Sequence, residues 1–280
     1  MSVRVLITGQ DSYIGSMFCE YTTEYYDAVD TIDMRTDDWR NYDFSRYDAV
    51  VHVAAIVHKQ EKAYTKQQYF EINTKLAYDV AKKAKREGVS QFVFLSTMSV
   101  YGVVNGVITK DTKCNPFNDY GKSKLQAEIM LTDICDESFA VSILRPPIVY
   151  GKGCKGNYNE LAHFAKKMPF FPNYKSQRSM IYIDNLCEII RLCIDNKLSG
   201  VFCPQDSDYV NTSHMVQLVA MANGRKIRLT KLFNPLITLA LKMKISIVQK
   251  VFGTLVYDTD LCPKYEKVDF ETAIYKTEEK

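Results

Sequence analysis

The chain has 280 residues, of which 46% are hydrophobic and 25% are charged, and this composition excludes disordered, collagen-like and coiled-coil proteins. The 36 basic and 33 acidic residues give a net charge of +3, which offers no support for nucleic acid as a partner. The longest apolar-leaning run, 232–241, contains Asn234 and Pro235 and is far shorter than the roughly 20 residues that span a membrane. We therefore expect a soluble protein of one or two domains.

The eight cysteines are scattered along the chain, and none belongs to a CxxC pair. Their spacing predicts no zinc site, and no metal is expected. A strand-like segment follows Met1 almost directly, without the pattern of a signal peptide, and a chain of this length does not need disulfides. We therefore expect eight reduced thiols in a cytoplasmic protein.

Strand and helix patterns alternate through the first half of the chain. Strands are expected at 3–8, 28–33, 49–54, 92–96 and 140–144, and helices from the first turn to about residue 24, over 72–86 and from near residue 120. This alternation predicts an α/β protein with a doubly wound parallel Rossmann sheet that is covered on both faces.

The pattern changes after Gly151. Segment 152–178 indicates a loop, a short helix and another loop, and a helix near 185–195 and a basic amphipathic stretch at 225–256 follow it. The charged end of the chain, from Lys264, is expected to fray. We predict an NAD(P)-binding Rossmann domain over 1–151 and a smaller α+β substrate-binding part over 152–280, with some segments mixed across the boundary.

A glycine-containing turn, TGQDSYIG, follows the first strand and opens the first helix. Two glycines take the outer positions of the dinucleotide fingerprint, and a serine replaces the middle glycine. The amide groups and the dipole of the helix N-terminus favour a pyrophosphate there, although a plain strand–helix turn is the alternative. The candidate cofactor contacts in this turn are Gly9, Ser12, Tyr13, Ile14 and Gly15.

Three further residues bear on the cofactor. Asp33 ends the second strand about 20 residues after the turn, where an acid binds the adenosine ribose hydroxyls. A carboxylate there repels a 2′-phosphate and favours NAD, but Arg35 could meet such a phosphate, so NADP is not excluded. Ala54 and Ala55 close the third strand with small side chains, which let a cofactor lie against it or serve only for close packing.

The segment DYGKSK places Tyr120 and Lys124 four residues apart, so the two side chains share one face of a helix. A tyrosine becomes an acid/base at neutral pH only if its phenolate is stabilised, and an ammonium one turn away does that. A YxxxK spacing also occurs on solvated helix faces. Here it is accompanied by Ser96 and Thr97 at the end of the fourth strand, where ligands of such sheets bind.

Together these pieces resemble the extended short-chain dehydrogenase/reductase family, specifically the NAD-dependent epimerase/dehydratase group that acts on nucleotide sugars. The matching segments, in family order, are TGQDSYIG, DAVVHVAA, Asn73, FLSTMSVYG, YGKSK, RPPIVYG (145–151) and RSMIYIDNL (178–186). The resemblance implies that Tyr120 is the acid/base, that Lys124 lowers its pKa and holds the nicotinamide ribose, and that Thr97 hydrogen-bonds the reacting oxygen.

The resemblance also implies further contacts. Arg178 is expected to bind the nucleotide-sugar diphosphate, and Asn157 to contact the diphosphate or the sugar. Their alternatives are a surface arginine and a loop asparagine. The remaining cofactor contacts implied by the family are Asn73, Ser96, Tyr120, Lys124 and Pro147.

Two departures from the family pattern narrow the reaction. The dehydratases follow the catalytic threonine with Asp and Glu, whereas this chain has Met98 and Ser99, so dehydration is not expected. Typical UDP-galactose 4-epimerases have an asparagine where this chain has Ile148, so we expect the contacts that bind the sugar diphosphate to differ.

We predict an NAD-dependent epimerase of a UDP-hexose or UDP-N-acetylhexosamine that acts through a 4-keto intermediate in polysaccharide biosynthesis. The alternatives are an NAD(P)H-dependent reductase of 4-keto (6-deoxy) nucleotide sugars, a reductase of another carbonyl compound, and a non-catalytic cofactor-binding module. The family also implies a homodimer formed through the helix that carries Tyr120. The basic stretch 225–253 raises the alternative of a weak peripheral membrane contact, but a helix of the substrate-binding part is the favoured interpretation.

Overall fold

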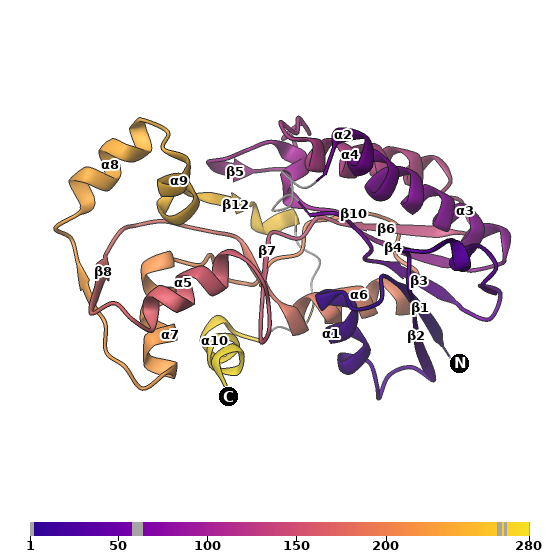
Figure 1. Ribbon diagram of the computed structural model, residues 1–280, viewed down its shortest axis with the longest axis horizontal. Coiled ribbons are helices and arrows are strands. Elements are labelled where there is room, and N and C mark those ends of the chain that lie inside the picture. The colour runs from indigo at the N-terminus through magenta and orange to yellow at the C-terminus, as the bar shows by residue number, and fades with distance from the viewer. Residues whose placement is uncertain (1–2, 58–63, 262–264, 266–267, 280) are drawn as a thin grey trace. The chain divides into compact units, whose positions relative to one another are not determined.

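The computed structural model describes residues 3–57, 64–261, 265 and 268–279. These residues form two compact units that are interleaved along the chain (Figure 1). Unit 1 consists of 1–102, 113–146 and 187–204, and unit 2 consists of 103–112, 147–186 and 205–280. The predicted division into functional domains near Gly151 stays a prediction.

Unit 1 is built on a six-stranded parallel sheet with the strand order β10-β6-β4-β3-β1-β2. The strands are β1 (Arg4–Thr8), β2 (Ala28–Ile32), β3 (Ala49–His52), β4 (Gln91–Leu95), β6 (Ala140–Leu144) and β10 (Gly200–Phe202). The predicted doubly wound parallel sheet is confirmed. The strand order reverses beside β1, so the carboxyl ends of β1 and β3 border the crevice in which such sheets bind ligands.

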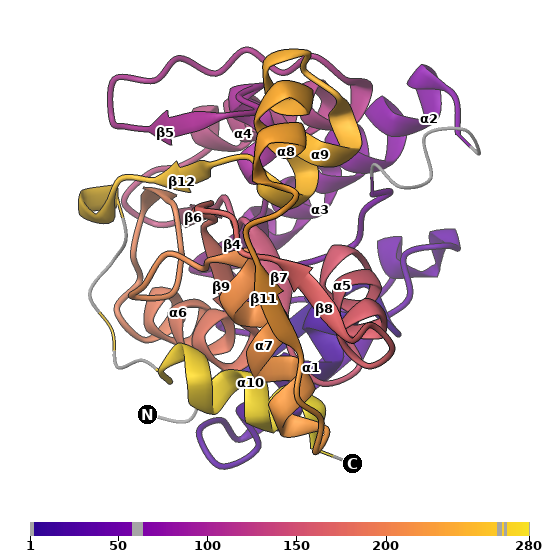
Figure 2. The same ribbon diagram turned by 90° about the vertical axis from the view of Figure 1, so that its left-hand side faces the viewer.

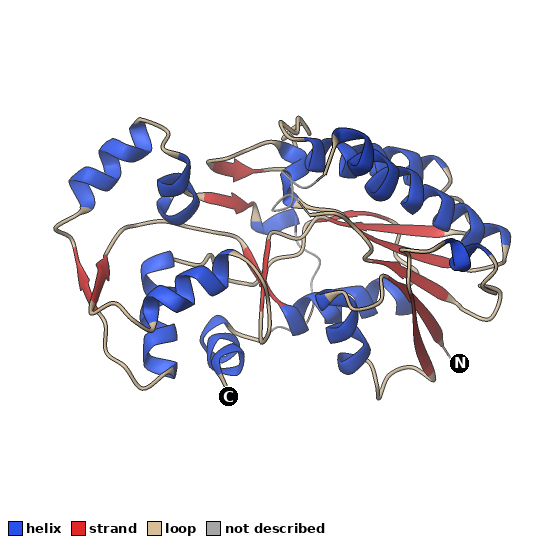
Figure 3. Ribbon diagram, viewed as in Figure 1, coloured by secondary structure: helices blue, strands red, loops and turns tan. Residues whose placement is uncertain are grey.

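Helices cover both faces of this sheet, as the blue ribbons on either side of the red strands in Figure 3 show. The helices of unit 1 are α1 (Tyr13–Tyr21), α2 (Lys66–Phe70), the π-helix η3 (Glu71–Leu76), α3 (Ala77–Arg86), α4 (Asp119–Asp133) and the 3₁₀ turns η1 (Asp37–Arg40) and η4 (Met98–Tyr101). Apolar side chains of α3 and α4, such as Val80 and Leu131, pack on Phe92 and Phe94 of the sheet. The predicted helix over 72–86 is therefore longer and contains a π-helical turn.

A further helix, α6 (Ile183–Asp195), begins in unit 2 and continues into unit 1. Within unit 1 its second half pairs with α1 and the segment that follows it, because Tyr21 donates to Glu188 at 3.0 Å and Tyr26 donates to Asp195 at 2.9 Å. These bonds fix α1, the helix that opens at the glycine turn, on its side of the sheet.

Unit 2 contains three small parallel strand pairs, β12–β5, β7–β9 and β11–β8. Its strands are β5 (Gly106–Ile108), β7 (Ile148–Tyr150), β8 (Phe170–Pro172), β9 (Met180–Tyr182), β11 (Arg228–Thr230) and β12 (Leu255–Tyr257). Its helices are α5 (Asn157–Ala165), α7 (Thr212–Ala222), α8 (Asn234–Lys242), α9 (Ser246–Phe252), α10 (Phe270–Glu278) and the 3₁₀ turn η5 (Thr259–Leu261). The stretch predicted as basic and amphipathic is thus a strand, a helical hairpin and a second strand.

The end of the chain differs from its prediction. Helix α10 packs on α7 and buries Phe270, Ala273 and Ile274, so fraying from Lys264 onwards is wrong for this segment. The prediction considered the charged residues and overlooked these three apolar side chains, which share one face of the helix.

The seven cysteines that the structure describes form no disulfide, and Cys262 lies outside the described residues. Among the described residues, no helix has the length and hydrophobicity needed to cross a membrane.

Candidate active site

The turn after β1 leaves no space for side chains at its two glycines. Gly9 has a φ of 116°, and a Cβ there would lie 3.0 Å from the main-chain nitrogen of Ala54. A Cβ on Gly15 would lie 2.5 Å from Oγ of Ser12 and 3.1 Å from Cγ2 of Ile7. These close approaches explain why the two outer glycines are needed and form a cradle that a pyrophosphate fits.

Ser12 has a second role in this cradle. Its Oγ accepts a hydrogen bond from the amide of Gly15 at 3.0 Å and thereby caps the N-terminus of α1. Because Oγ acts as an acceptor here, its hydroxyl proton can still be donated to a ligand. Tyr13 and Ile14 form the first turn of α1, next to the cap.

The predicted conflict between Asp33 and Arg35 is resolved by the geometry. The carboxylate of Asp33 accepts from the amide and from Nε of Arg35, both at 2.9 Å, and a second carboxylate, Asp11, lies 3.5 Å from the same guanidinium. The Arg35 guanidinium lowers the pKa of Asp33 by hydrogen bonding. Arg35 is therefore turned toward two carboxylates, which favours NAD over a cofactor with a 2′-phosphate.

Tyr120 lies on the first turn of α4, whose N-cap Asn118 accepts from the amide of Gly121 at 2.8 Å. Its side chain is buried with Ile56 and Tyr69. Burial raises the pKa of Tyr120 to about 12, while a hydrogen bond with Thr97 opposes this rise. The two groups that the sequence assigned to the reacting oxygen, Thr97 and Tyr120, are thus brought together at the carboxyl end of β4.

Lys124 is almost completely buried beneath the same strand end. Its ammonium donates to the main-chain oxygen of Leu95 at 2.7 Å and lies 4.5 Å from the ring centroid of Phe94. Burial lowers the pKa of Lys124 to about 7, and the nearby Glu128 carboxylate opposes this shift. The predicted effect of Lys124 on the pKa of Tyr120 stays a prediction, because here the ammonium is held by Leu95.

Lys124 should give the cofactor-free protein a characteristic dependence of stability on pH. Its pKa is lowered on folding, so between pH about 7 and about 10.5 the unfolded chain holds a proton that the folded chain releases. The free energy of unfolding therefore increases as pH rises through that window, and it decreases as pH falls back through it. We expect urea titrations to show this slope reduced in Lys124→Met but kept in Lys122→Met, an exposed neighbour on α4. An equal slope in all three proteins would contradict the assignment.

Asn73 joins the cofactor side of the sheet to the catalytic helix. Its Oδ1 accepts from the amide of Ile56 at 2.8 Å, and its Nδ2 donates to the oxygen of Ile56 at 3.0 Å and to Oγ of Ser123 at 3.1 Å. Ser123 in turn donates to the main-chain oxygen of Tyr120 at 2.9 Å. Asn73 lies in the π-helical turn η3, an irregularity frequent at functional sites, and is linked to the main chain of Tyr120 through Ser123, while its contact with the cofactor stays a prediction.

Ser96 is held by a buried ion pair that the sequence analysis missed. Its hydroxyl donates to Glu128, and Glu128 also accepts from Nε of Arg145 at 3.1 Å and 3.2 Å. A second nitrogen of Arg145 donates to Tyr101 at 2.8 Å. The available signal was the spacing, since Glu128 follows Lys124 by four residues and continues the face of α4 that carries Tyr120.

Unit 2 holds the predicted substrate contacts and one cofactor contact. Pro147 precedes β7, and Asn157 opens α5. Arg178 is 9% exposed, and its guanidinium donates to the main-chain oxygen of Gln249. Its Nε has no hydrogen-bond partner among the described residues, and burial lowers its pKa. A buried guanidinium without a carboxylate partner is suited to an anionic ligand.

The predicted site residues divide between the units. Unit 1 holds Gly9, Ser12, Tyr13, Ile14, Gly15, Asp33, Ala54, Ala55, Asn73, Ser96, Thr97, Tyr120 and Lys124, and unit 2 holds Pro147, Asn157 and Arg178. The individual roles of these residues stay predictions.

A parallel doubly wound sheet with a tight glycine turn after β1, an acid directly after β2 and a Thr–Tyr–Lys group at the end of β4 is the arrangement of a dinucleotide-dependent enzyme of the short-chain dehydrogenase/reductase type. The model of the NAD dependent epimerase/dehydratase family matches residues 5–202. The chain therefore belongs to this family, is an enzyme, and uses NAD as its cofactor.

Two curated relatives are similar over most of the chain. A UDP-glucose 4-epimerase of Vibrio cholerae is 34% identical over 227 residues, which cover 75% of this chain and 68% of the relative. An N-acetyl-α-D-glucosaminyl-diphospho-ditrans,octacis-undecaprenol 4-epimerase of Escherichia coli O157:H7 is 26% identical over 248 residues, covering 81% of this chain and 74% of the relative.

Solved structures share the fold. A UDP-glucuronic acid 4-epimerase from Bacillus cereus, in complex with NAD, superposes with a TM-score of 0.73 at 18% identity and covers 98% of this chain and 97% of its own. A dTDP-4-dehydrorhamnose reductase from Clostridium acetobutylicum has a TM-score of 0.65 at 19% identity and covers 81% and 83% of the two chains.

Proposed function

We propose that this enzyme interconverts the C4 epimers of a UDP-linked hexose or N-acetylhexosamine through a 4-keto intermediate, in the cytoplasm and for polysaccharide biosynthesis. The observation that carries the proposal is the contact of Tyr120 with Thr97 above the buried Lys124. The 34% sequence identity to the UDP-glucose 4-epimerase of Vibrio cholerae supports the proposal. The absence of a carboxylate at Met98 and Ser99 speaks against dehydration.

The residues of the chain fit a proton transfer at the sugar C4 oxygen. When bound, NAD supplies the hydride acceptor and a positive ring charge. Tyr120 removes the proton of the C4 hydroxyl and returns it, because a hydrogen bond from Thr97 favours the phenolate. With NAD bound, Lys124 would hold the nicotinamide ribose and add positive charge beside Tyr120. Arg178 anchors the diphosphate while the sugar turns over, since its guanidinium is buried and no carboxylate pairs with it in the part of the chain that the structure describes.

The direct test is an assay of purified protein against a panel of UDP-sugars, together with an assay of the nucleotide released on denaturation. We expect the protein to retain NAD and to interconvert 4-epimers without added cofactor. Turnover that requires NADH or NADPH, with no nucleotide retained, would instead establish the 4-ketoreductase, which the same residues could serve.

A second substrate class is an N-acetylhexosamine diphosphate linked to a polyprenol, as in the name of the Escherichia coli relative. The observation that favours it is the contact of Arg178 with Gln249, which places the candidate diphosphate-binding group against α9. Helix α9 carries Ile247, whose side chain is 71% exposed. Adding the polyprenol-linked substrate to the same panel distinguishes the two classes.

Cofactor choice should depend on Asp33. In Asp33→Gly the carboxylate that repels a 2′-phosphate is removed and Arg35 loses its nearer partner, which leaves only the exposed Asp11 at 3.5 Å to compete with that phosphate. We expect NADP to bind at least about tenfold more tightly relative to NAD, the value of one charge-assisted hydrogen bond. Titrations of nucleotide-depleted protein with NADH and NADPH, monitored by the fluorescence of the reduced nicotinamide, give both dissociation constants. The double variant Asp33→Gly/Arg35→Ala should lose the gain, and a gain that persists there would contradict the role of Arg35.

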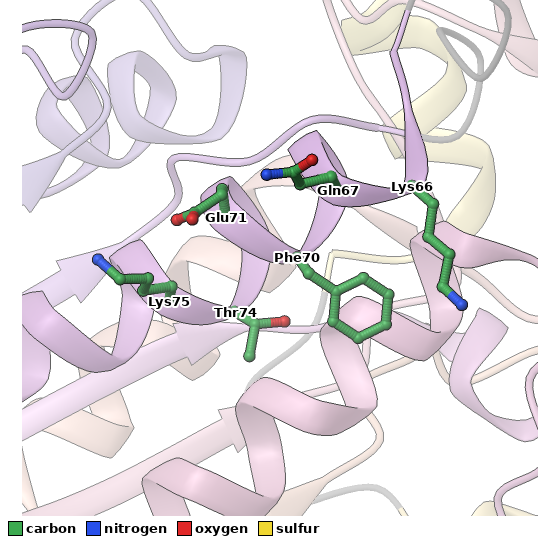
Figure 4. A pocket seen from close by; sticks show the side chains of 6 residues that line it. All are labelled: Lys66, Gln67, Phe70, Glu71, Thr74 and Lys75. Carbon is green, nitrogen blue, oxygen red and sulfur yellow. The ribbon is translucent and has the colours of Figure 1, made fainter.

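We also propose a homodimer formed through α4 and its neighbours. Ile129 on α4 is 50% exposed. A hollow of about 620 Å³ lies along α2 and η3 and is lined by Lys66, Gln67, Phe70, Glu71, Thr74 and Lys75 (Figure 4). A helix of a second copy could fill such a hollow. Light scattering should show a dimer for the native chain and a monomer for Ile129→Glu, whereas Tyr275→Glu, an exposed position on α10, should leave the dimer intact.

A further inference from the structure

Helix α8 presents a continuous apolar stripe on its outer side. Leu236 and Leu239 are three residues apart on α8, Met243 is the C-cap four residues further on, and Leu232 lies in the turn just before the helix. In chain order from Leu232 to Met243, the four side chains are 77%, 66%, 55% and 67% exposed. Scattered exposed apolar residues are ordinary, but a row of four large ones marks an interaction surface.

The inner side of α8 is apolar as well. Ile237 is buried, and Phe233 stacks on Phe170 of β8 with 6.2 Å between the ring centroids. These contacts attach the helix to unit 2 and leave the stripe uncovered by any described residue of this unit. A helix at a water-facing surface has a polar outer side, so α8 has the composition of a helix with apolar surroundings on both sides.

The segment around this stripe carries charge of one sign only. No Asp or Glu occurs between Asp208 and Asp258, and within the described part of the chain no ion pair involves the basic residues of this segment. These basic residues are Arg225, Lys226, Arg228, Lys231, Lys242, Lys244 and Lys250. All seven are exposed, and three of them, Lys231, Lys242 and Lys244, border the stripe directly.

The charge decides between the partners that an apolar stripe could meet. A second copy that paired through the same face would bring these cations against one another without any carboxylate to neutralise them. An anionic bilayer suits both the charge and the apolar stripe, since its headgroups attract lysines and its acyl region takes up leucine and methionine side chains. With its inner side packed on unit 2, its stripe outward and lysines at both ends, α8 can place apolar side chains in the acyl boundary and lysines among the headgroup phosphates.

We propose that the α8–α9 hairpin docks this enzyme on the surface of an anionic membrane. Helices α8 and α9 pack against each other (Figure 2), and the exposed Ile247 of α9 adds to the apolar surface. Leu236 and Leu239 enter the acyl boundary, while Lys242 and Lys244 meet lipid phosphates. The contact of Arg178 with Gln249 joins the docked hairpin to the candidate diphosphate site of the same unit. Docking goes beyond the proposed function, because it requires no substrate.

Sedimentation of the full-length protein with lipid vesicles tests the proposal. We expect binding to phosphatidylcholine vesicles that contain phosphatidylglycerol, little binding to phosphatidylcholine alone, and weaker binding as salt screens the lysines. The double variant Leu236→Glu/Leu239→Glu should bind at least about tenfold less, because it removes buried apolar area and adds like charge to the lipid. Lys242→Glu/Lys244→Glu should lose the preference for phosphatidylglycerol.

Matched controls keep the outcome clear. Phe117→Glu, at an apolar residue of unit 1 that is 64% exposed, and Lys82→Glu on α3 should bind like the native chain. Thermal unfolding and NAD retention should be unchanged in all these variants. In Met243→Trp, the new fluorophore should shift to shorter wavelength only with anionic vesicles, since Trp39 is already buried. The proposal would be overturned if Leu236→Glu/Leu239→Glu bound vesicles as well as the native chain, or if the native chain bound no vesicles. It would also be overturned if the native chain formed an oligomer that Leu236→Glu/Leu239→Glu dissociated.

Discussion

Tyr120→Phe is expected to lower the turnover of UDP-sugar epimerisation by roughly 10²–10⁴-fold, the usual contribution of a positioned acid/base. The phenol is buried beside Ile56 and Tyr69, so phenylalanine fits the same space and removes only the hydroxyl. We therefore expect retained NAD, an unchanged fold and a nearly unchanged KM. Steady-state kinetics with the substrate found in the UDP-sugar panel give the two constants separately.

The control for this prediction is Tyr25→Phe, which removes the hydroxyl of an exposed tyrosine of unit 1 and should leave turnover at the native value. Thr97→Val should also lower turnover, since the hydrogen bond that favours the phenolate is lost. Near-native turnover of Tyr120→Phe would show that another group moves the proton and would remove the basis of the proposed mechanism.

The parts of the fold that the sequence predicted correctly are those governed by local patterns. Buried strands of parallel sheets are continuous apolar runs, and β1, β3 and β4 have such runs, as the burial of Val5, Val50 and Phe92 shows. The glycine turn was also predictable from a local pattern, because the backbone geometry at the junction of one strand and one helix requires Gly9 and Gly15.

The features that sequence reasoning missed depend on contacts between distant segments. Glu128 and Arg145 are 17 residues apart, and each alone has the appearance of an ordinary charged residue. The burial of Arg178, with an Nε that has no hydrogen-bond partner among the described residues, becomes evident only when the neighbouring strands and α9 enclose it. The sequence predicted a basic amphipathic stretch around α8 but not the exposure of its apolar residues, because helical spacing is the same for a buried face and an uncovered one.

The buried pair of Glu128 and Arg145 leads to the largest predicted effect on stability. The two side chains are only 4% and 11% exposed, and Ser96 and Tyr101 also bond to them. In Arg145→Met the carboxylate of Glu128 stays buried without its cation, which costs about 3–5 kcal/mol in comparable proteins. We expect a loss of that size in the free energy of unfolding, measured by urea titration. Ser96 bonds to Glu128 and is followed directly by Thr97, so a disturbed pair should also displace Thr97. We therefore expect lower activity even at urea concentrations too low to unfold the variant.

A double variant separates the loss of pairing from the loss of packing. Glu128→Leu/Arg145→Met removes both charges, and replacing both members of a buried pair is often close to neutral. We therefore expect the double variant to be more stable than Arg145→Met, which is the signature of coupling in a double-mutant cycle. Arg40→Met, which breaks the exposed pair with Asp37, should change stability little. If Arg145→Met were as mild as Arg40→Met, or if the double variant were the least stable, the pair would not be the element that fixes the end of β4 against α4.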